Sequence, residues 1–379
     1  MRLHSGLVVS IVILAAPGAA RAQAPVFSIE AAAAGVLSTA SDADRQYLLR
    51  AIPQIDWGRA VSTDWTFDIT ASLSAATGAT YLSGAKVSGD SDVDAHRVWA
   101  RLASARFEAR VGLQQISFGS AAVFRPLMWF DRLDARDPLQ FTKGVYGALA
   151  RYVTAGNASV WAWALYGNDD PRGWDALGTK ADTPEFGGRA QAPFLGGELA
   201  GSYHHRVADI TPFLPPGSPP ASAAENRVGF DGKWDVGVGV WFETSLTHTD
   251  STALRRAWQP SWTVGADYTF GVGSGLTLLA EQFYLDPAVP AFAPSAALEL
   301  TAVTATYPVG VANMLTGAFY YEWRRDDAYR FVEWRRTYDH WRFHVIGFWN
   351  PDQASPFAPG SQASALTGKG VELVIVASY

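Results

Sequence analysis

The chain of 379 residues contains no cysteine. Disulfide frameworks, thiolate zinc sites and cysteine nucleophiles are therefore excluded together. Acidic residues outnumber basic ones, 36 to 30, which argues against the basic surface that nucleic acids require. The sequence also has neither an H-E-x-x-H pair nor a G-x-S-x-G elbow. We expect no nucleic-acid partner, no cofactor and no metal.

Long hydrophobic runs are absent beyond the first residues. The apolar stretch 6–16 (GLVVSIVILAA) follows Arg2 and precedes Ala20-Arg21-Ala22, which has the small-x-small form of a cleavage site. This order predicts a signal peptide over 1–22, because the stretch is too short to span a bilayer as a helix. The alternative is an N-terminal helix that is retained and buried. The mature chain, 23–379, keeps 28 basic and 36 acidic residues once Arg2 and Arg21 are removed.

Aromatic residues are abundant, at 13% of the chain with 15 Trp, yet the mean hydropathy is near zero. Every second residue of 64–74 (DWTFDITASLS) is apolar, and 106–114, 235–247 and 261–270 alternate in the same way. A period of two is typical of β-strands. In a membrane barrel one face of each strand meets lipid and the other meets water, so the average hydropathy cancels. We therefore predict an all-β fold, a transmembrane antiparallel up-and-down β-barrel formed by the whole mature chain.

The alternation predicts eighteen strands, an even number as bacterial barrels require. They are 27–37, 45–58, 62–74, 94–103, 106–118, 144–154, 157–166, 184–192, 196–206, 224–233, 235–248, 260–270, 274–285, 296–307, 310–321, 328–337, 339–349 and 369–379. Sixteen strands is the alternative, if one hairpin within 94–118 or 184–206 is misassigned.

The predicted connections alternate between long and short without exception, as expected for long extracellular loops and short periplasmic turns. The long ones are 38–44, 75–93, 119–143, 167–183, 207–223, 249–259, 286–295, 322–327 and 350–368. The final strand alternates as Val371, Leu373, Ile375 and Ala377 and ends on Tyr379. It resembles the C-terminal signature that the barrel-assembly machinery recognises. The alternative is an ordinary edge strand.

The polar faces of 94–103 and 106–118 carry basic residues that we expect in a lumen. With one carboxylate and one amide, these pore-lining candidates are Arg97, Arg101, Arg106, Glu108, Arg110 and Gln114. Further basic candidates are Arg189, Arg206, Arg227 and Lys233, and acidic ones are Asp64, Asp68, Glu243, Asp267 and Glu281. A basic wall facing an acidic wall would bias ion passage. The alternative is that these charges only hydrate the interior and pair with one another.

The signal peptide, alternating strands, loop parity and terminal aromatic together resemble Gram-negative porins over the whole mature length. The strand count resembles the eighteen-strand substrate-selective and alginate-export porins, and 110–119 (RVGLQQISFG) is similar to the strand that enters their functional loop. The resemblance implies a passive outer-membrane channel for small polar or anionic solutes. It places the protein among outer-membrane lipid and lipopolysaccharide, allows an oligomer, and extends the family's basic pore ladder to Arg97, Arg101, Arg106 and Arg110.

The segment 119–143 resembles by position the third extracellular loop that general porins fold into the lumen as a constriction. Its charged residues then complete the predicted constriction: Arg125, Asp131, Arg132, Asp134 and Arg136. Basic residues outnumber acidic ones in this predicted constriction. This predicts a preference for anions despite the acidic net charge of the chain, because a permeating ion responds to the electric field of the narrowest section. The alternative is an external loop stabilised by Asp–Arg pairs.

Two other functions stay open at this stage. One is an outer-membrane barrel enzyme of the phospholipase or protease type, although no histidine shows a pattern that ties it to a nucleophile. The other is a plugged barrel that binds a surface partner through its loops. A cluster of Arg and Trp within 323–349 predicts either a track for anionic solutes or an aromatic girdle at the membrane interface. His204 and His205 are adjacent on a strand, so they point to opposite faces and cannot share a metal.

Overall fold

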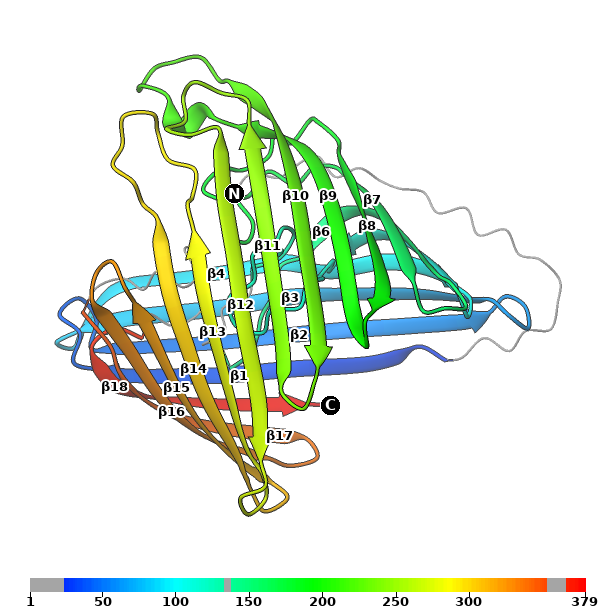
Figure 1. Ribbon diagram of the computed structural model, residues 1–379. Coiled ribbons are helices and arrows are strands. Elements are labelled where there is room, and N and C mark those ends of the chain that lie inside the picture. Colours follow the sequence, from blue (N-terminus) through cyan, green and yellow to red (C-terminus); the bar gives the residue numbers. More distant parts are fainter. Residues whose placement is uncertain (1–23, 133–137, 353–365) are drawn as a thin grey trace.

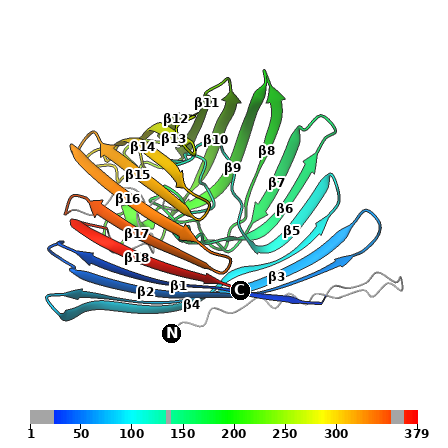
Figure 2. The same cartoon turned by 90° about the horizontal axis from the view of Figure 1, so that it is seen from below.

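The described residues of the computed structural model, 24–132, 138–352 and 366–379, form one closed antiparallel sheet. Eighteen strands follow one another around the barrel in chain order, and pairing of the last strand with the first closes it (Figures 1 and 2). In the described part of the chain no helix is long and apolar enough to cross a bilayer. The predicted signal peptide lies outside the described residues.

The eighteen predicted strands are all present. Their bounds are β1 Val26–Ser38, β2 Arg45–Ala60, β3 Thr66–Leu82, β4 Ala85–Ala103, β5 Phe107–Gln114, β6 Val145–Val153, β7 Ser159–Leu165, β8 Glu185–Phe194, β9 Gly197–Asp209, β10 Ser222–Asp235, β11 Gly239–Thr249, β12 Trp258–Phe270, β13 Leu276–Leu285, β14 Leu298–Val309, β15 Asn313–Glu322, β16 Asp327–Thr337, β17 Trp341–Trp349 and β18 Lys369–Ser378. We call the end with the long connections the loop end and the opposite end the turn end.

Alternation along each strand separates the outer and inner faces of the barrel. In β10, Val228 and Phe230 are exposed on the outside, whereas Arg227 and Asp231 are buried on the inside. This arrangement is reversed from a soluble protein, because the outer face meets lipid and the inner face can hold polar groups. His204 is 1% exposed and points inward, as its position in the alternation predicts.

One predicted loop is wrong. The segment 75–93 is not a long connection, because β3 and β4 continue as a hairpin and are joined only by Ser83 and Gly84. Both turn residues have positive φ, 50° and 86°, which suits a tight two-residue turn. The alternation fades there because both faces of the hairpin carry polar and small residues, so the pattern disappears although the strand pairing continues.

The strand predicted over 106–118 is shorter than expected. Gly112 adopts φ 121° and lies so close to β4 that an added Cβ would be 2.2 Å from the carbonyl oxygen of Val98. This irregularity precedes the end of β5 at Gln114. From there the chain leaves the wall and runs into the barrel until β6 begins at Val145. We call 115–144 the inward loop; its residues 133–137 are outside the described part.

Candidate pore constriction

Two carboxylates on the inner wall hold the inward loop by its backbone. Glu281 of β13 accepts hydrogen bonds from the N–H groups of Ala122, Val123 and Phe124, at 2.6, 3.0 and 2.8 Å. Glu243 of β11 accepts from the loop N–H groups of residues 121 and 127, at 2.9 and 2.5 Å. Charged acceptors make strong hydrogen bonds with N–H donors and need them when buried. The third long loop is therefore inside the barrel, as the porin resemblance implies.

Apolar side chains of the same loop fill the space beside these anchors. Phe124 packs against Phe283 and Tyr320 in a buried cluster that extends over β13 to β17. Trp129 and Phe130 belong to a second cluster with inward residues of β6 and β7. The inward loop thus fills the barrel interior beside β6, β7 and β13 to β17.

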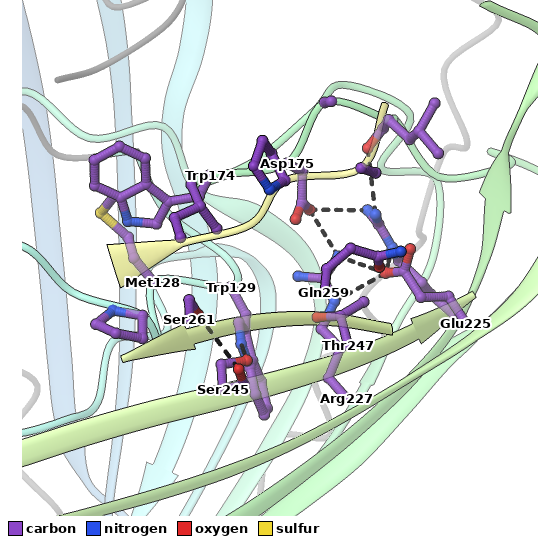
Figure 3. A pocket seen from close by; sticks show the side chains of 17 residues that line it. Met128, Trp129, Trp174, Asp175, Glu225, Arg227, Ser245, Thr247, Gln259 and Ser261 are labelled. Carbon is purple, nitrogen blue, oxygen red and sulfur yellow. Dashed lines mark hydrogen bonds and ion pairs between the residues drawn. The ribbon is translucent and has the colours of Figure 1, made fainter. Parts of the chain in front are cut away.

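A second loop-end segment, 166–184, closes the barrel near β9 and β10. Asp175 accepts hydrogen bonds or ion pairs from Arg206 at 3.0 Å and Arg227 at 2.8 Å, and Glu225 contacts both arginines at 2.6 Å (Figure 3). The cavity beside this network is only about 50 Å³. These two arginines are offset by two carboxylates, so their charge is not available to a solute.

Arg172 of the same segment contacts Glu185 at 2.5 Å, and His204 contacts that carboxylate at 3.1 Å. Burial lowers the pKa of the Arg172 guanidinium, and the attraction of Glu185 acts in the opposite direction. Farther toward the turn end, Arg189 binds both oxygens of Asp231, at 2.5 and 2.9 Å. The inner wall on this side is polar, but its charges are paired.

Larger cavities lie on the other side of the inward loop: the outer one borders β3 to β6 and the segment 166–184, and the inner one borders β1, β2 and β4. An outer cavity of about 400 Å³ faces the loop end and includes Asp92, Asp94, Asp131, Lys143 and Asn168 in its lining. An inner cavity of about 310 Å³ faces the turn end and is lined by Glu30, Ala32, Arg50, Ile52, Gln54, His96, Arg97, Gln115, Leu139, Gln140, Phe141 and Thr142. The two cavities mark the candidate passage through the barrel.

The predicted basic ladder is only partly in this passage. Arg97 lines the inner cavity and donates to the carbonyl and hydroxyl oxygens of Thr142, at 3.1 and 2.7 Å. Arg101 pairs with Asp68 at 2.8 Å, and Arg110 pairs with Glu108 at 2.8 Å. The structure thus brings the predicted strand residues together, but as ion pairs that reduce the field of the ladder.

Two predicted pore residues have different surroundings from those expected. Arg106 precedes β5 in an exposed turn, so its assignment to the polar face of a strand is wrong. Gln114 is fully buried, and its amide donates to the carbonyl oxygens of Arg110 and Gly147, at 3.3 and 3.0 Å. It holds backbone at the end of β5, where the chain departs from the alternating pattern.

The charged side chains of Arg125 and Asp131 in the inward loop form hydrogen bonds with neighbouring protein groups. Arg125 donates to Ser117 and to the carbonyl of Phe118, at 3.0 and 2.8 Å. Asp131 is 3% exposed and accepts from Gln115 and from the N–H of Arg132, both at 2.8 Å. Burial raises the pKa of the Asp131 carboxyl, and these hydrogen bonds oppose the rise. Asp134 and Arg136 lie outside the described residues.

Sequence analysis missed three residues of the passage, Arg50, His96 and Phe141. Arg50 could have been found, since it is opposite in phase to the exposed residues Tyr47 and Leu49 of β2. His96 could not, because a register shift next to Ser72 disrupts the phase of β4. Phe141 lies in a segment without periodicity.

No protein-family model and no curated protein sequence matches the chain. Its fold is similar to OpdK of Pseudomonas aeruginosa, solved with vanillate, with 13% identity and a TM-score of 0.56 over 94% of this chain and 98% of that chain. OccAB4 of Acinetobacter baumannii has 11% identity and a TM-score of 0.55 over 93% and 96%. Wzi of Escherichia coli, described as a carbohydrate-binding β-barrel, has 12% identity and a TM-score of 0.52 over 92% and 83%. The chain thus has the porin-type barrel fold.

Proposed function

We propose that this protein is a passive channel of the Gram-negative outer membrane for small polar solutes. The observation that carries the proposal is the pair of cavities with polar residues in their lining, about 400 and 310 Å³, between the inward loop and the wall from β1 to β6. In bacterial outer-membrane barrels the long loops are extracellular and the short turns are periplasmic, so the loop end faces the cell exterior and the turn end faces the periplasm. The outer face contacts membrane lipid and lipopolysaccharide, and the barrel-assembly machinery inserts the chain after removal of 1–22.

The channel function is tested by single-channel recording in planar bilayers with the purified protein. We expect stepwise openings, together with swelling of liposomes in small neutral sugars. A protein that migrates as a folded, heat-modifiable barrel but gives neither openings nor swelling would rule out a channel. The plugged barrel that binds a surface partner would then be the better interpretation.

We propose further that the passage prefers anions, and that Arg50 and Arg97 produce the preference. Both line the inner cavity, and the only carboxylate among the described lining residues is Glu30, which pairs with Arg342 at 3.3 Å. A basic narrow section attracts anions whatever the net charge of the whole chain. Arg106 contributes little here because it is exposed in a turn.

The matched variants are Arg97→Gln and Arg106→Gln. We expect Arg97→Gln to reduce the anion-to-cation permeability ratio about twofold, because the passage loses one of its lining positive charges. Arg106→Gln removes the same charge outside the passage and should leave the reversal potential in a salt gradient unchanged. Equal effects of the two variants, or a cation-selective wild type, would contradict this assignment.

Catalysis is not part of the proposal. Both ring nitrogens of His204 are engaged, one by Trp163 at 3.2 Å and one by Glu185 at 3.1 Å. His344 contacts Glu333 at 2.6 Å. In the described ranges neither ring has a hydrogen bond to a hydroxyl group, the arrangement by which a histidine base activates a nucleophile.

A further inference from the structure

The outer and inner cavities meet at one place. Only His96 of β4 and Phe141 of the inward loop line both cavities among the described residues. Their rings are stacked, with centroids 5.2 Å apart and planes inclined by 23°. The guanidinium carbon of Arg50 on β2 lies 4.2 Å from the centroid of the Phe141 ring. The Phe141 ring is therefore the partition between the two halves of the passage.

Phe141 is a residue of the inward loop, but residues of the barrel wall on β2 and β4 fix its position. Arg97 donates to both oxygens of Thr142, the residue after Phe141, and also to the carbonyl oxygen of His96 at 2.6 Å. One guanidinium thus connects the backbone beside the ring to the strand that carries the stacked histidine. The stack on His96 and the cation–π contact with Arg50 are each worth on the order of 1 kcal/mol. A side-chain rotation can therefore break the stack while the loop stays in place.

We propose that Phe141 is the gate of the passage, and that its ring sets the upper size of the solutes that cross. With the ring in its stack the two cavities are separate; with the ring turned away they form one continuous path. Arg50 and His96 are the positioning residues that keep the ring in the closed arrangement. The gate rests on the proposed channel function, and its test separates the two.

The first test compares conductance in three variants. Phe141→Ala removes the ring and should raise single-channel conductance at least about twofold and accelerate liposome swelling in disaccharides. Phe141→Tyr retains a ring and should stay close to the wild type. Phe292→Ala removes a fully exposed phenyl ring from a surface loop and should have no effect. Heat-modifiable migration on gels verifies that each variant is folded.

The second test uses the absence of cysteine from the native chain. A single Phe141→Cys can be labelled without background by a bulky thiol reagent, which restores volume at the partition. We expect the raised conductance of Phe141→Cys to fall by about half or more after labelling, whereas labelled Phe292→Cys keeps its current.

The outcomes distinguish the gate from the channel. If the wild type conducts and Phe141→Ala has the same conductance and the same swelling rates, the gate is refuted and the channel stands. If neither protein conducts, both proposals fail. If the wild type is closed and Phe141→Ala conducts, the ring blocks the lumen permanently, and both the passive channel and the size-setting gate are refuted.

Discussion

At the scale of single residues, the charged side chains of the interior fall into two groups. In the first, protein groups neutralise or bind the charge: Glu281 and Glu243 accept hydrogen bonds from backbone N–H groups of the inward loop, and Arg101 pairs with Asp68. Arg97 instead lines the open passage. Since all of these side chains point inward, their direction alone does not decide whether a solute can sense them. What decides is whether the side chain borders a cavity and whether a carboxylate offsets its charge: Arg97 lines the inner cavity and donates to neutral oxygens of Thr142 and His96.

Asp131 gives a prediction about pH. Burial raises its pKa above the ordinary value of 3.8, so the folded protein holds this proton to a higher pH than the unfolded chain does. The contribution of Asp131 to stability is therefore favourable below pH 3.8 and is lost as the pH rises through the raised pKa. Asp131→Asn should weaken this pH dependence and leave the thermal midpoint at neutral pH equal to that of the wild type or higher.

The measurement is the temperature of heat-modifiable migration between about pH 4 and 8, the range in which a raised carboxyl titrates. Asp235→Asn at an exposed position beside a turn-end connection is the control, and it should keep the wild-type profile. An identical pH profile for Asp131→Asn and the wild type would show that Asp131 does not titrate in this window.

At the scale of elements, the inward loop depends on a few anchors rather than on regular structure. Glu281 accepts three loop N–H groups and the indole N–H of Trp241 at 2.9 Å. Glutamine supplies only one acceptor oxygen, so Glu281→Gln leaves buried N–H donors without an acceptor. Each such donor lowers the stability of the folded loop by about 1–3 kcal/mol. We expect noisier open-channel current and faster proteolytic cleavage within the loop. Glu299→Gln, on β14 away from these anchors, should match the wild type in both measurements.

A Glu281→Gln channel with wild-type noise and wild-type protease resistance would place the anchoring elsewhere. Glu243 and the Thr263 hydroxyl, which donates to the carbonyl of Phe124 at 2.6 Å, are then the remaining contacts to vary.

At the scale of the whole molecule, closure of the barrel depends on the two ends of the described chain. Tyr379 and Ile29 exchange backbone hydrogen bonds at 3.0 and 2.8 Å, and the Tyr379 ring stacks on His340 with centroids 5.0 Å apart. Deletion of Tyr379 should lower the yield of folded barrel in the outer membrane, because the last two backbone hydrogen bonds between β1 and β18 are lost together with the predicted assembly signal. Tyr379→Phe retains the ring and should assemble normally. The assay is cell fractionation followed by heat-modifiable gels, and normal assembly of the deletion would contradict the assignment.

The sequence by itself determined the barrel. Strict alternation between apolar and polar residues sets which face of each strand meets lipid, and this local property predicted all eighteen strands, β10 with its inward Arg227 among them. It failed where the alternation ends: in the hairpin 75–93, whose two faces both carry polar and small residues, and at the turn residue Arg106. The porin resemblance, not the alternation, indicated that 119–143 enters the lumen.

The passage itself was decided only by the tertiary structure. Arg101 and Arg97 occupy equivalent inward positions on β4, yet one is offset by Asp68 and the other lines a cavity beside Thr142. The stack of Phe141 on His96 joins a loop without periodicity to a strand whose phase is shifted. Such contacts connect residues far apart in the chain, and no local pattern encodes them. They depend on how the closed barrel brings the loop against β1 to β4.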